Sequence, residues 1–143
     1  MANIHDRYLE EEVLGADPVR LVELLYRGAI DALRSARKHL AEGGIRERAR
    51  EINRAWGILQ ELAQSLDHTQ GGEISQGLSR LYAYMQTRLL EANAKQSEAP
   101  LEEVEALLSS LLEAWQAARQ SVAPAAPVQG NDPEFEVSAI AVG

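Results

Sequence analysis

Three histidines and a surplus of carboxylates are the side chains of this sequence that could bind a metal ion. Helical bundles build di-metal sites from Glu-x-x-His pairs on facing helices. The histidines are His5, His39 and His68, and none of them follows a glutamate by three residues. The chain also has no cysteine, which excludes a thiolate zinc site and a cysteine nucleophile. We therefore expect no metal site.

Two short runs contain residue types that are typical of enzyme or nucleotide sites. Ser65, Asp67 and His68 have the residue types of a hydrolase triad, but their closeness on one helix does not give triad geometry. Gly71-Gly72 precedes an expected helix, yet the phosphate-loop pattern is missing and Glu73 places a negative charge where a phosphate would bind. We expect no catalytic residue and no cofactor, and we expect that the protein is not an enzyme.

Length and charge restrict the class of protein further. The chain has 143 residues, enough for one domain with one core, and 14 Lys+Arg against 22 Asp+Glu give a net charge of −8. A nucleic-acid partner is not expected, because such binding depends on a basic excess. No apolar run approaches the ~20 residues that cross a bilayer, and the opening MANIHDRYLEEEV lacks the basic, apolar start of a signal peptide. We expect no stable membrane insertion and a cytoplasmic location.

Four amphipathic stretches with helical periodicity must carry any functional side chains, and we expect helices at about 18–41, 45–68, 72–94 and 101–121. Asp17 and Pro18 form a helix start, because the aspartate can accept a backbone N–H and the proline suits the first helical position. Glycine pairs at 43–44 and 71–72 are expected to end the first two helices. Four helices of about 30 Å with short connections predict an all-α, antiparallel up-down four-helix bundle over residues 17–121.

The two ends of the chain are expected to lie outside the bundle. Residues 1–16 are predicted to form a short N-terminal arm. Residues 122–143 hold three of the five prolines, and their only charges are acidic. Their first half, VAPAAPVQGNDP, is too rich in proline, alanine and glycine to hold a helix or build a core. We expect this tail to be disordered.

The helices offer more apolar surface than their own packing needs. The apolar stripe is about 100° wide on the third helix and wider on the other three. Leu24, Ile58, Tyr84 and Leu90 fall outside these stripes altogether. Surplus apolar surface favours a groove for another helix or an extended segment, or pairing with a second copy of the chain. Both alternatives stay open from the residues alone.

A basic stripe lies opposite the apolar side of the second helix. Arg46, Arg50 and Arg54 follow each other at four-residue spacing, and Glu47 and Glu51 interleave with them. Like charges at this spacing repel each other slightly, so helix stability alone does not explain the pattern. A solvated face and a docking patch for an acidic partner both stay open.

Several short blocks follow one another in a characteristic order between residues 8 and 120. They are YLEEEV (8–13), ADP (16–18), LVELLYRGAI (21–30), ILQEL (58–62), SLD (65–67), GGEI (71–74), LYAYM (81–85), RLLEAN (88–93), EEV (102–104), LL (107–108) and AW (114–115). Together these blocks resemble the flagellin export chaperones, the FliS family. Asp17 stands where the family usually has a small hydroxyl residue, and Trp56 is bulkier than the family's usual residue.

The resemblance implies a helical bundle that binds the C-terminal segment of flagellin in the cytoplasm. In the family, that segment is disordered when free and wraps around the chaperone. The chaperone keeps it from polymerising and delivers it to the flagellar type III export gate. The family's N-terminal arm covers an apolar cleft and moves aside when flagellin binds. By position, that arm is the stretch around Tyr8 and Val13.

We expect the partner contacts to involve the arm and apolar positions of the second and fourth helices. The candidate partner-binding residues are Tyr8, Val13, Ile52, Trp56, Leu59, Leu108, Leu112 and Trp115. The six helix positions are assigned from the width of the apolar stripes, and Tyr8 and Val13 are assigned from the resemblance. The alternative function is that of a generic helical adaptor or a homo-oligomer, and a homodimer of the free protein stays open.

Overall fold

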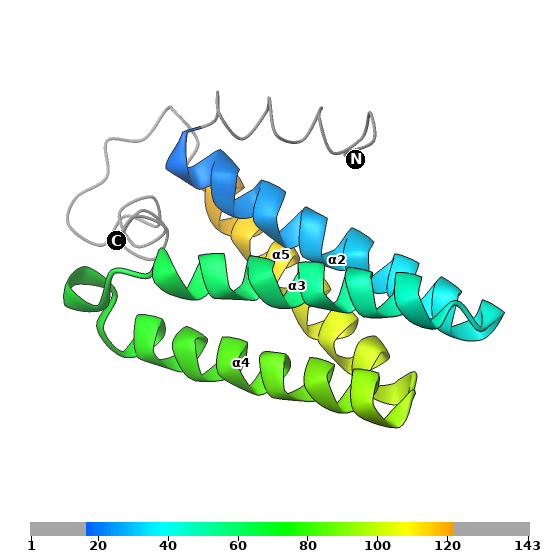
Figure 1. Ribbon diagram of the computed structural model, residues 1–143. Helices are drawn as coiled ribbons and strands as arrows, with labels where there is room; N and C mark the ends of the chain where they lie inside the picture. The colour runs from blue at the N-terminus through cyan, green and yellow to red at the C-terminus, as the bar shows by residue number, and fades with distance from the viewer. Residues whose placement is uncertain (1–16, 122–143) are drawn as a thin grey trace.

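The computed structural model describes residues 17–121, and every element in this range is a helix (Figure 1). The helices are α2 (Pro18–Glu42), α3 (Ile45–Gln64), α4 (His68–Lys95) and α5 (Ala99–Ser121). Both α2 and α4 contact α3 and α5, so the four helices form a closed ring. The expected all-α, antiparallel four-helix bundle is confirmed for these residues. The predictions for the arm and the tail lie outside the described residues.

The ends of α2 follow from the residues that flank it. The backbone N–H of Arg20 donates to Asp17 Oδ1 at 2.7 Å, and Pro18 occupies the first turn. At the other end Gly43 has a φ of 77°, a left-handed conformation that costs little without a Cβ. The N–H of Gly44 then bonds to His39 O at 2.8 Å. The expected N-cap and glycine stop of this helix are confirmed.

The junction between α3 and α4 differs from the expectation. We expected the second helix to end near residue 68, but α3 ends at Gln64, and Asp67 is the N-cap of the next helix. The Asp67 carboxylate accepts the backbone N–H groups of residues 69 and 70 at 3.0 and 3.1 Å. One helical turn follows, Gly72 interrupts it with φ 54° and ψ −127°, and the helix then continues to Lys95. The expected break at the glycine pair is therefore a kink inside α4.

The kink at Gly72 gives a prediction for stability. Only glycine adopts this backbone conformation without strain, so Gly72→Ala is expected to lower the free energy of unfolding by about 1–3 kcal/mol. Gly77→Ala is the matched control, because Gly77 is helical and a Cβ there meets no atom within 4 Å. The control is expected to raise stability by about 0.5–1 kcal/mol. Urea unfolding of both variants checks the prediction, and equal effects would contradict it.

One continuous apolar core runs through the bundle. Its members come from all four helices and include Leu33, Ile52, Leu59, Met85, Leu89, Val104 and Leu108. Two phenols lie within it, and the hydroxyl oxygens of Tyr26 on α2 and Tyr82 on α4 are hydrogen-bonded at 2.6 Å. Burial raises the pKa of both phenols, so both are neutral at pH 7. This pair links the two helices that lie diagonally across the ring.

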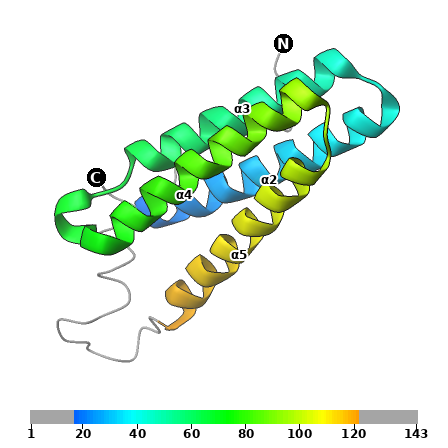
Figure 2. The ribbon, with the colours of Figure 1, turned by 90° about the horizontal axis from the view of Figure 1, so that it is seen from below.

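The bundle is not symmetrical, because α5 diverges from α4. The two helices are close at their connection, and they separate toward the C-terminal end of α5 in both ribbon views (Figures 1 and 2). In the same direction α5 comes close to the start of α2, where Trp115 Nε1 donates to Val19 O at 3.2 Å. The second half of α5 therefore packs on α2 rather than on α4.

Candidate functional site

The structure places the sequence-predicted partner-binding residues at different depths. Ile52, Leu59 and Leu108 are core residues that are at most 1% exposed, and Trp115 is also buried. Trp56 and Leu112 are half-buried and pack against this core. Tyr8 and Val13 lie outside the described residues. Of the eight positions, only Trp56 and Leu112 are shown with accessible surface.

Trp56 lies beside α4. Its backbone carbonyl accepts a hydrogen bond from Gln86 Nε2 at 3.3 Å, and the same amide also donates to Gln60 Oε1 at 3.1 Å. The indole Nε1 of Trp56 is buried and has no hydrogen-bond partner among the residues that the structure describes.

Both α4 and α5 carry a row of apolar side chains next to the point where the two helices touch. The sequence analysis did not assign these side chains to the site. On α5, Leu107 and Leu111 follow Glu103 at four-residue spacing, which puts them on the same side of the helix. On α4 a similar row precedes Tyr84 in steps of three or four residues, and it consists of Ile74, Leu78 and Leu81. Ile74 is 49% exposed, and the other four are half-buried. We call these five residues the α4–α5 flanks.

Polar contacts between α4 and α5 are confined to one end of the seam. Glu103 accepts from Arg88 Nε at 2.7 Å and from the Tyr84 hydroxyl at 2.9 Å. These hydrogen bonds keep the pKa of the Glu103 carboxyl below its ordinary value. Beyond this contact α5 turns toward α2, and the α4–α5 flanks are the apolar side chains of the diverging part. A pattern in the sequence could have revealed these flanks. On each helix, apolar residues at helical spacing lie next to the polar residues that join α4 to α5.

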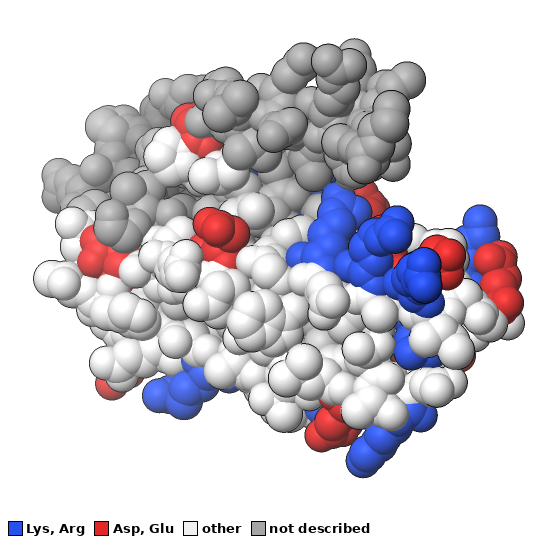
Figure 3. Space-filling view, in the orientation of Figure 1, with Lys and Arg blue, Asp and Glu red and all other residues white. Residues whose placement is uncertain are grey.

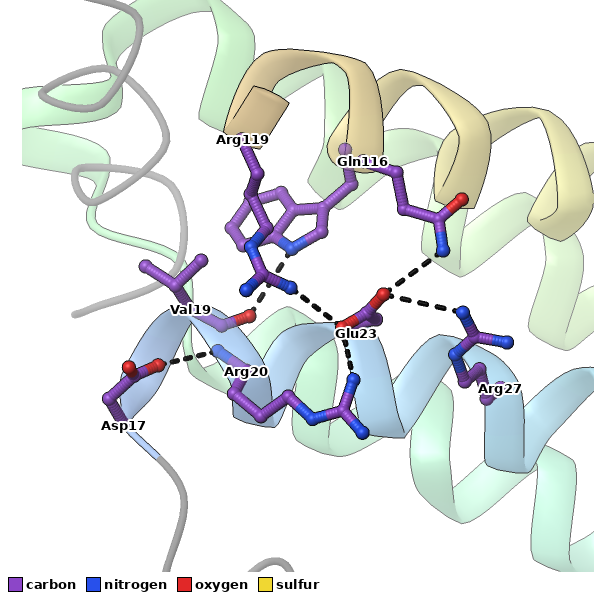
Figure 4. Close-up of polar contacts among 8 residues, drawn as sticks. Asp17, Val19, Arg20, Glu23, Arg27, Gln116 and Arg119 are labelled. Carbon is purple, nitrogen blue, oxygen red and sulfur yellow. Dashed lines mark hydrogen bonds and ion pairs between the residues drawn. The ribbon is translucent and has the colours of Figure 1, made fainter. Parts of the chain in front are cut away.

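A buried carboxylate holds the second half of α5 on α2 (Figure 4). Glu23 on α2 is only 5% exposed. Its Oε1 accepts from Gln116 Nε2 at 3.0 Å and from Arg27 at 3.4 Å, and its Oε2 accepts from Arg119 Nη1 at 2.7 Å and from Arg20. We call these five residues the Glu23 cluster. Two of them come from α5, so the cluster joins the helices.

The surroundings of Glu23 determine its charge. Burial raises the pKa of the Glu23 carboxyl, because it disfavours the charged form. Hydrogen bonds from Gln116 and Arg20 and the charges of Arg119 and Arg20 outweigh burial and lower the pKa to about 2. Glu23 is therefore ionised at pH 7, and its charge stabilises the α2–α5 contact. Sequence reasoning missed this residue, because its partners on α5 are more than 90 residues away.

A hollow of about 410 Å³ opens beside the Glu23 cluster. Among the described residues it is lined by Glu23, Gln116, Arg119 and Gln120. All four side chains can form hydrogen bonds, and a guanidinium and two carboxamides supply donors. The hollow therefore suits a polar or charged group rather than an apolar one.

The exposed apolar residues outside the α4–α5 flanks are scattered. Leu90 and Ile45 are each 57% exposed, and Tyr84 is exposed on α4. Of the four residues that fall outside the apolar stripes, Tyr84 and Leu90 are exposed and Ile58 is half-buried, whereas Leu24 is buried.

The basic stripe of α3 is open to solvent over most of its length. Arg46 and Arg50 are exposed, while Arg54 approaches Glu51 to 3.5 Å. In the space-filling view, Lys and Arg side chains gather on one part of the face, and a wide area beside them has few charges (Figure 3). Both earlier interpretations of the stripe, a solvated face and a docking patch for an acidic partner, stay open.

The residue types that could do chemistry have structural roles in the described part of the chain. Ser65 Oγ donates to Leu62 O at 2.8 Å, and the Asp67 carboxylate caps α4. Within residues 17–121 no three His, Asp or Glu side chains are grouped so that they could hold a metal ion. Among the described helices, none has the length and apolar character needed to span a membrane.

The comparisons with known proteins show the family of this chain. The model of the family described as flagellar protein FliS matches residues 1–122, more than four fifths of the chain. The chain belongs to the FliS family. Its FliS relatives include the flagellar secretion chaperone FliS of Salmonella typhimurium, 42% identical over 108 residues that cover 75% of this chain and 80% of the relative.

Other FliS relatives come from other bacteria. The flagellar secretion chaperone FliSB of Pseudomonas aeruginosa is 39% identical and covers 75% of this chain and 85% of its own length. The flagellar secretion chaperone FliS of Bacillus subtilis is 30% identical and covers 83% of this chain and 88% of its own length. The resemblance that the sequence blocks carry is thus confirmed. The FliS match ends at residue 122, one residue beyond α5.

Proposed function

We propose that this FliS-family protein is a cytoplasmic export chaperone that binds the disordered C-terminal segment of flagellin. It keeps the segment from polymerising and delivers it to the flagellar type III export gate. Membership of a family whose relatives are named flagellar secretion chaperones carries this proposal. The mechanism is coupled folding and binding, without a chemical step.

The energetics of such a guest require a large apolar surface. Ordering a ~30-residue segment costs on the order of 30–60 kcal/mol of backbone entropy. At ~25 cal/mol/Å², about 1,200–2,400 Å² of apolar surface must be buried before any net affinity results. A small pocket is therefore insufficient, and the guest must extend along several helices. The α4–α5 flanks supply half-buried leucines for one part of this contact.

The proposed partner-binding residues differ in whether a guest can reach them in the described conformation. Trp56 and Leu112, together with the α4–α5 flanks, can contact a guest in the described conformation because they retain accessible surface. Ile52, Leu59, Leu108 and Trp115 can do so only if helices move apart, because they are buried. Tyr8 and Val13 stay proposed contacts of the arm, from the resemblance alone.

A direct binding experiment tests the proposed partner. The purified chain is titrated with flagellin and with flagellin that lacks its C-terminal segment. We expect binding to the intact protein and none to the truncated one. If the truncated flagellin binds as tightly as the intact protein, the proposal is contradicted.

A second candidate function is homo-oligomerisation, which the α4–α5 flanks favour. Their apolar side chains retain accessible surface next to one another, and such a surface can pair with a second copy of the chain. Sedimentation at low protein concentration separates the two functions. An obligate dimer without affinity for flagellin supports this candidate, and a monomer that binds flagellin excludes it.

Deletion of residues 122–143 is expected to leave folding and flagellin binding intact. The bundle ends with α5 at residue 121, and the FliS match ends at residue 122. Thermal unfolding and flagellin titration of the shortened chain check this expectation. A large loss of stability or affinity would show that the tail is functional.

A further inference from the structure

We infer that the hollow beside the Glu23 cluster is a binding site for a carboxylate of the guest polypeptide. This inference rests on the proposed function and names one specific contact within it. It concerns a different part of the molecule from the α4–α5 flanks. The site combines a cavity, a surplus of positive charge and side chains that are already held in place.

The first observation is the charge of the Glu23 cluster. Three guanidinium groups, from Arg20, Arg27 and Arg119, form ion pairs with the single carboxylate of Glu23. Arg27 and Arg119 alone bring two positive charges to this one carboxylate, although the whole chain has a net charge of −8. A second carboxylate would reduce this local excess, whereas a cationic group would increase it.

The second observation is the number of hydrogen-bond donors that the cluster leaves available. A guanidinium has five N–H donors. Arg119 gives one of them to Glu23 Oε2 and Arg27 gives one to Glu23 Oε1. Neither donates to a further group among the residues that the structure describes. Arg119 also lines the hollow, so its remaining donors can reach a ligand there.

The third observation is the shape and composition of the hollow. Its volume of about 410 Å³ is large enough for a terminal residue or an acidic side chain. The carboxamides of Gln116 and Gln120 line it together with Arg119 and can donate to a carboxylate oxygen. The Arg119 side chain is 38% exposed, so the ion pair with a ligand is partly protected from water.

The Glu23 carboxylate prepares this site rather than competing with it. It fixes Arg119 and Gln116 in contact with α2, so these side chains lose little further freedom when a ligand arrives. Arginine pairs with carboxylates in a forked, two-bond geometry, which favours a carboxylate over a neutral oxygen. A guest carboxylate supplies the missing negative charge.

The carboxylate can be the free C-terminus of the guest or one of its acidic side chains, and the test separates these sources. The probe is a synthetic peptide of the C-terminal segment of flagellin from the same organism. One version keeps its terminal carboxylate, a second is amidated, and a third has Asn and Gln in place of Asp and Glu. Each is titrated calorimetrically into the full chain.

Two variants change the charge of the Glu23 cluster, and a third variant is a matched control. Arg119→Gln and Arg27→Gln each remove one guanidinium of the Glu23 cluster. Arg34→Gln is the control. It removes an ion pair that also joins α2 to α5 but lies away from the hollow, where Arg34 approaches Glu105 to 3.4 Å. Circular dichroism verifies that each variant folds, and Arg27→Gln replaces Arg119→Gln if the latter does not.

Arg119→Gln is expected to weaken binding of the unmodified peptide about tenfold, and Arg34→Gln less than twofold. One of the two modified peptides is expected to bind the unchanged protein about tenfold more weakly. That peptide lacks the carboxylate that pairs with Arg119, so Arg119→Gln causes little further loss of affinity for it. The peptide that shows this coupling identifies the source of the carboxylate.

The inference is overturned if the losses from Arg119→Gln and from both modified peptides simply add. It is also overturned if Arg119→Gln and Arg27→Gln bind like Arg34→Gln, or if the coupling requires residues 122–143, whose own carboxylates would then fill the hollow. Each of these results leaves binding of the unmodified peptide intact and so leaves the proposed function standing. If the unchanged protein does not bind that peptide, the proposed function itself fails.

Discussion

Glu23→Gln is expected to lower the free energy of unfolding by about 3 kcal/mol at pH 7. The pKa of Glu23 falls from 4.5 to about 2 on folding, and each pKa unit corresponds to ~1.4 kcal/mol. Glutamine has nearly the same shape but no charge, so the variant keeps the packing and loses this contribution. Urea unfolding at pH 7 measures the difference, and thermal unfolding should shift down by about 10 °C.

The same residue predicts a dependence on pH. The folded-state pKa of Glu23 lies below its unfolded value, so its stabilisation is complete above about pH 4.5 and is lost as the pH falls toward 2. The stability difference between the unchanged chain and Glu23→Gln should therefore shrink over this range. Glu102→Gln is the control, because its ion pair with Arg37 is exposed and contributes less than about 1 kcal/mol. A difference that stays constant from pH 7 to pH 2 would contradict the role of the Glu23 charge.

Ile74→Asp is expected to weaken flagellin binding about 100-fold while it leaves the bundle folded. Ile74 is one of the α4–α5 flanks and is 49% exposed, so the charged side chain can remain in water in the free protein. In the complex the carboxylate would be buried against an apolar guest, and an unpaired buried charge costs several kcal/mol. Calorimetric titration with flagellin gives the change in affinity, and circular dichroism verifies the fold.

Leu90→Asp is the matched control for this variant. Leu90 lies on the same helix and is even more exposed, but it does not belong to the flanks. The control is expected to change the affinity less than twofold. If Leu90→Asp weakens binding as strongly as Ile74→Asp, the guest does not select the α4–α5 flanks.

Much of the fold could be predicted from local signals in the sequence. Asp17 before Pro18 gave the start of α2, and Gly43 gave its end, because these residues act on the backbone next to them. Helical periodicity gave the four stretches and their order. The end of α3 was harder to predict, because Asp67 serves the following helix and the apolar pattern does not reveal which helix a cap belongs to.

The candidate site was predicted less well, because it depends on how far each helix diverges from its neighbours. Leu59 and Leu107 are both apolar positions of amphipathic helices, yet the first is buried and the second retains accessible surface. The difference arises from the divergence of α5, which the contacts of Glu23 and Trp115 with residues 93 or more positions away hold in place. No local pattern contains these contacts.

Site-specific photo-crosslinking tests most directly which surface of the bundle receives the guest. A photoreactive amino acid is placed at residue 74, at residue 111 or at residue 90, and each protein is irradiated with flagellin. We predict crosslinks from residues 74 and 111 to the C-terminal segment of flagellin and none from residue 90. Crosslinks from residue 90 alone, or none from any of the three positions to a flagellin that binds, would contradict the account.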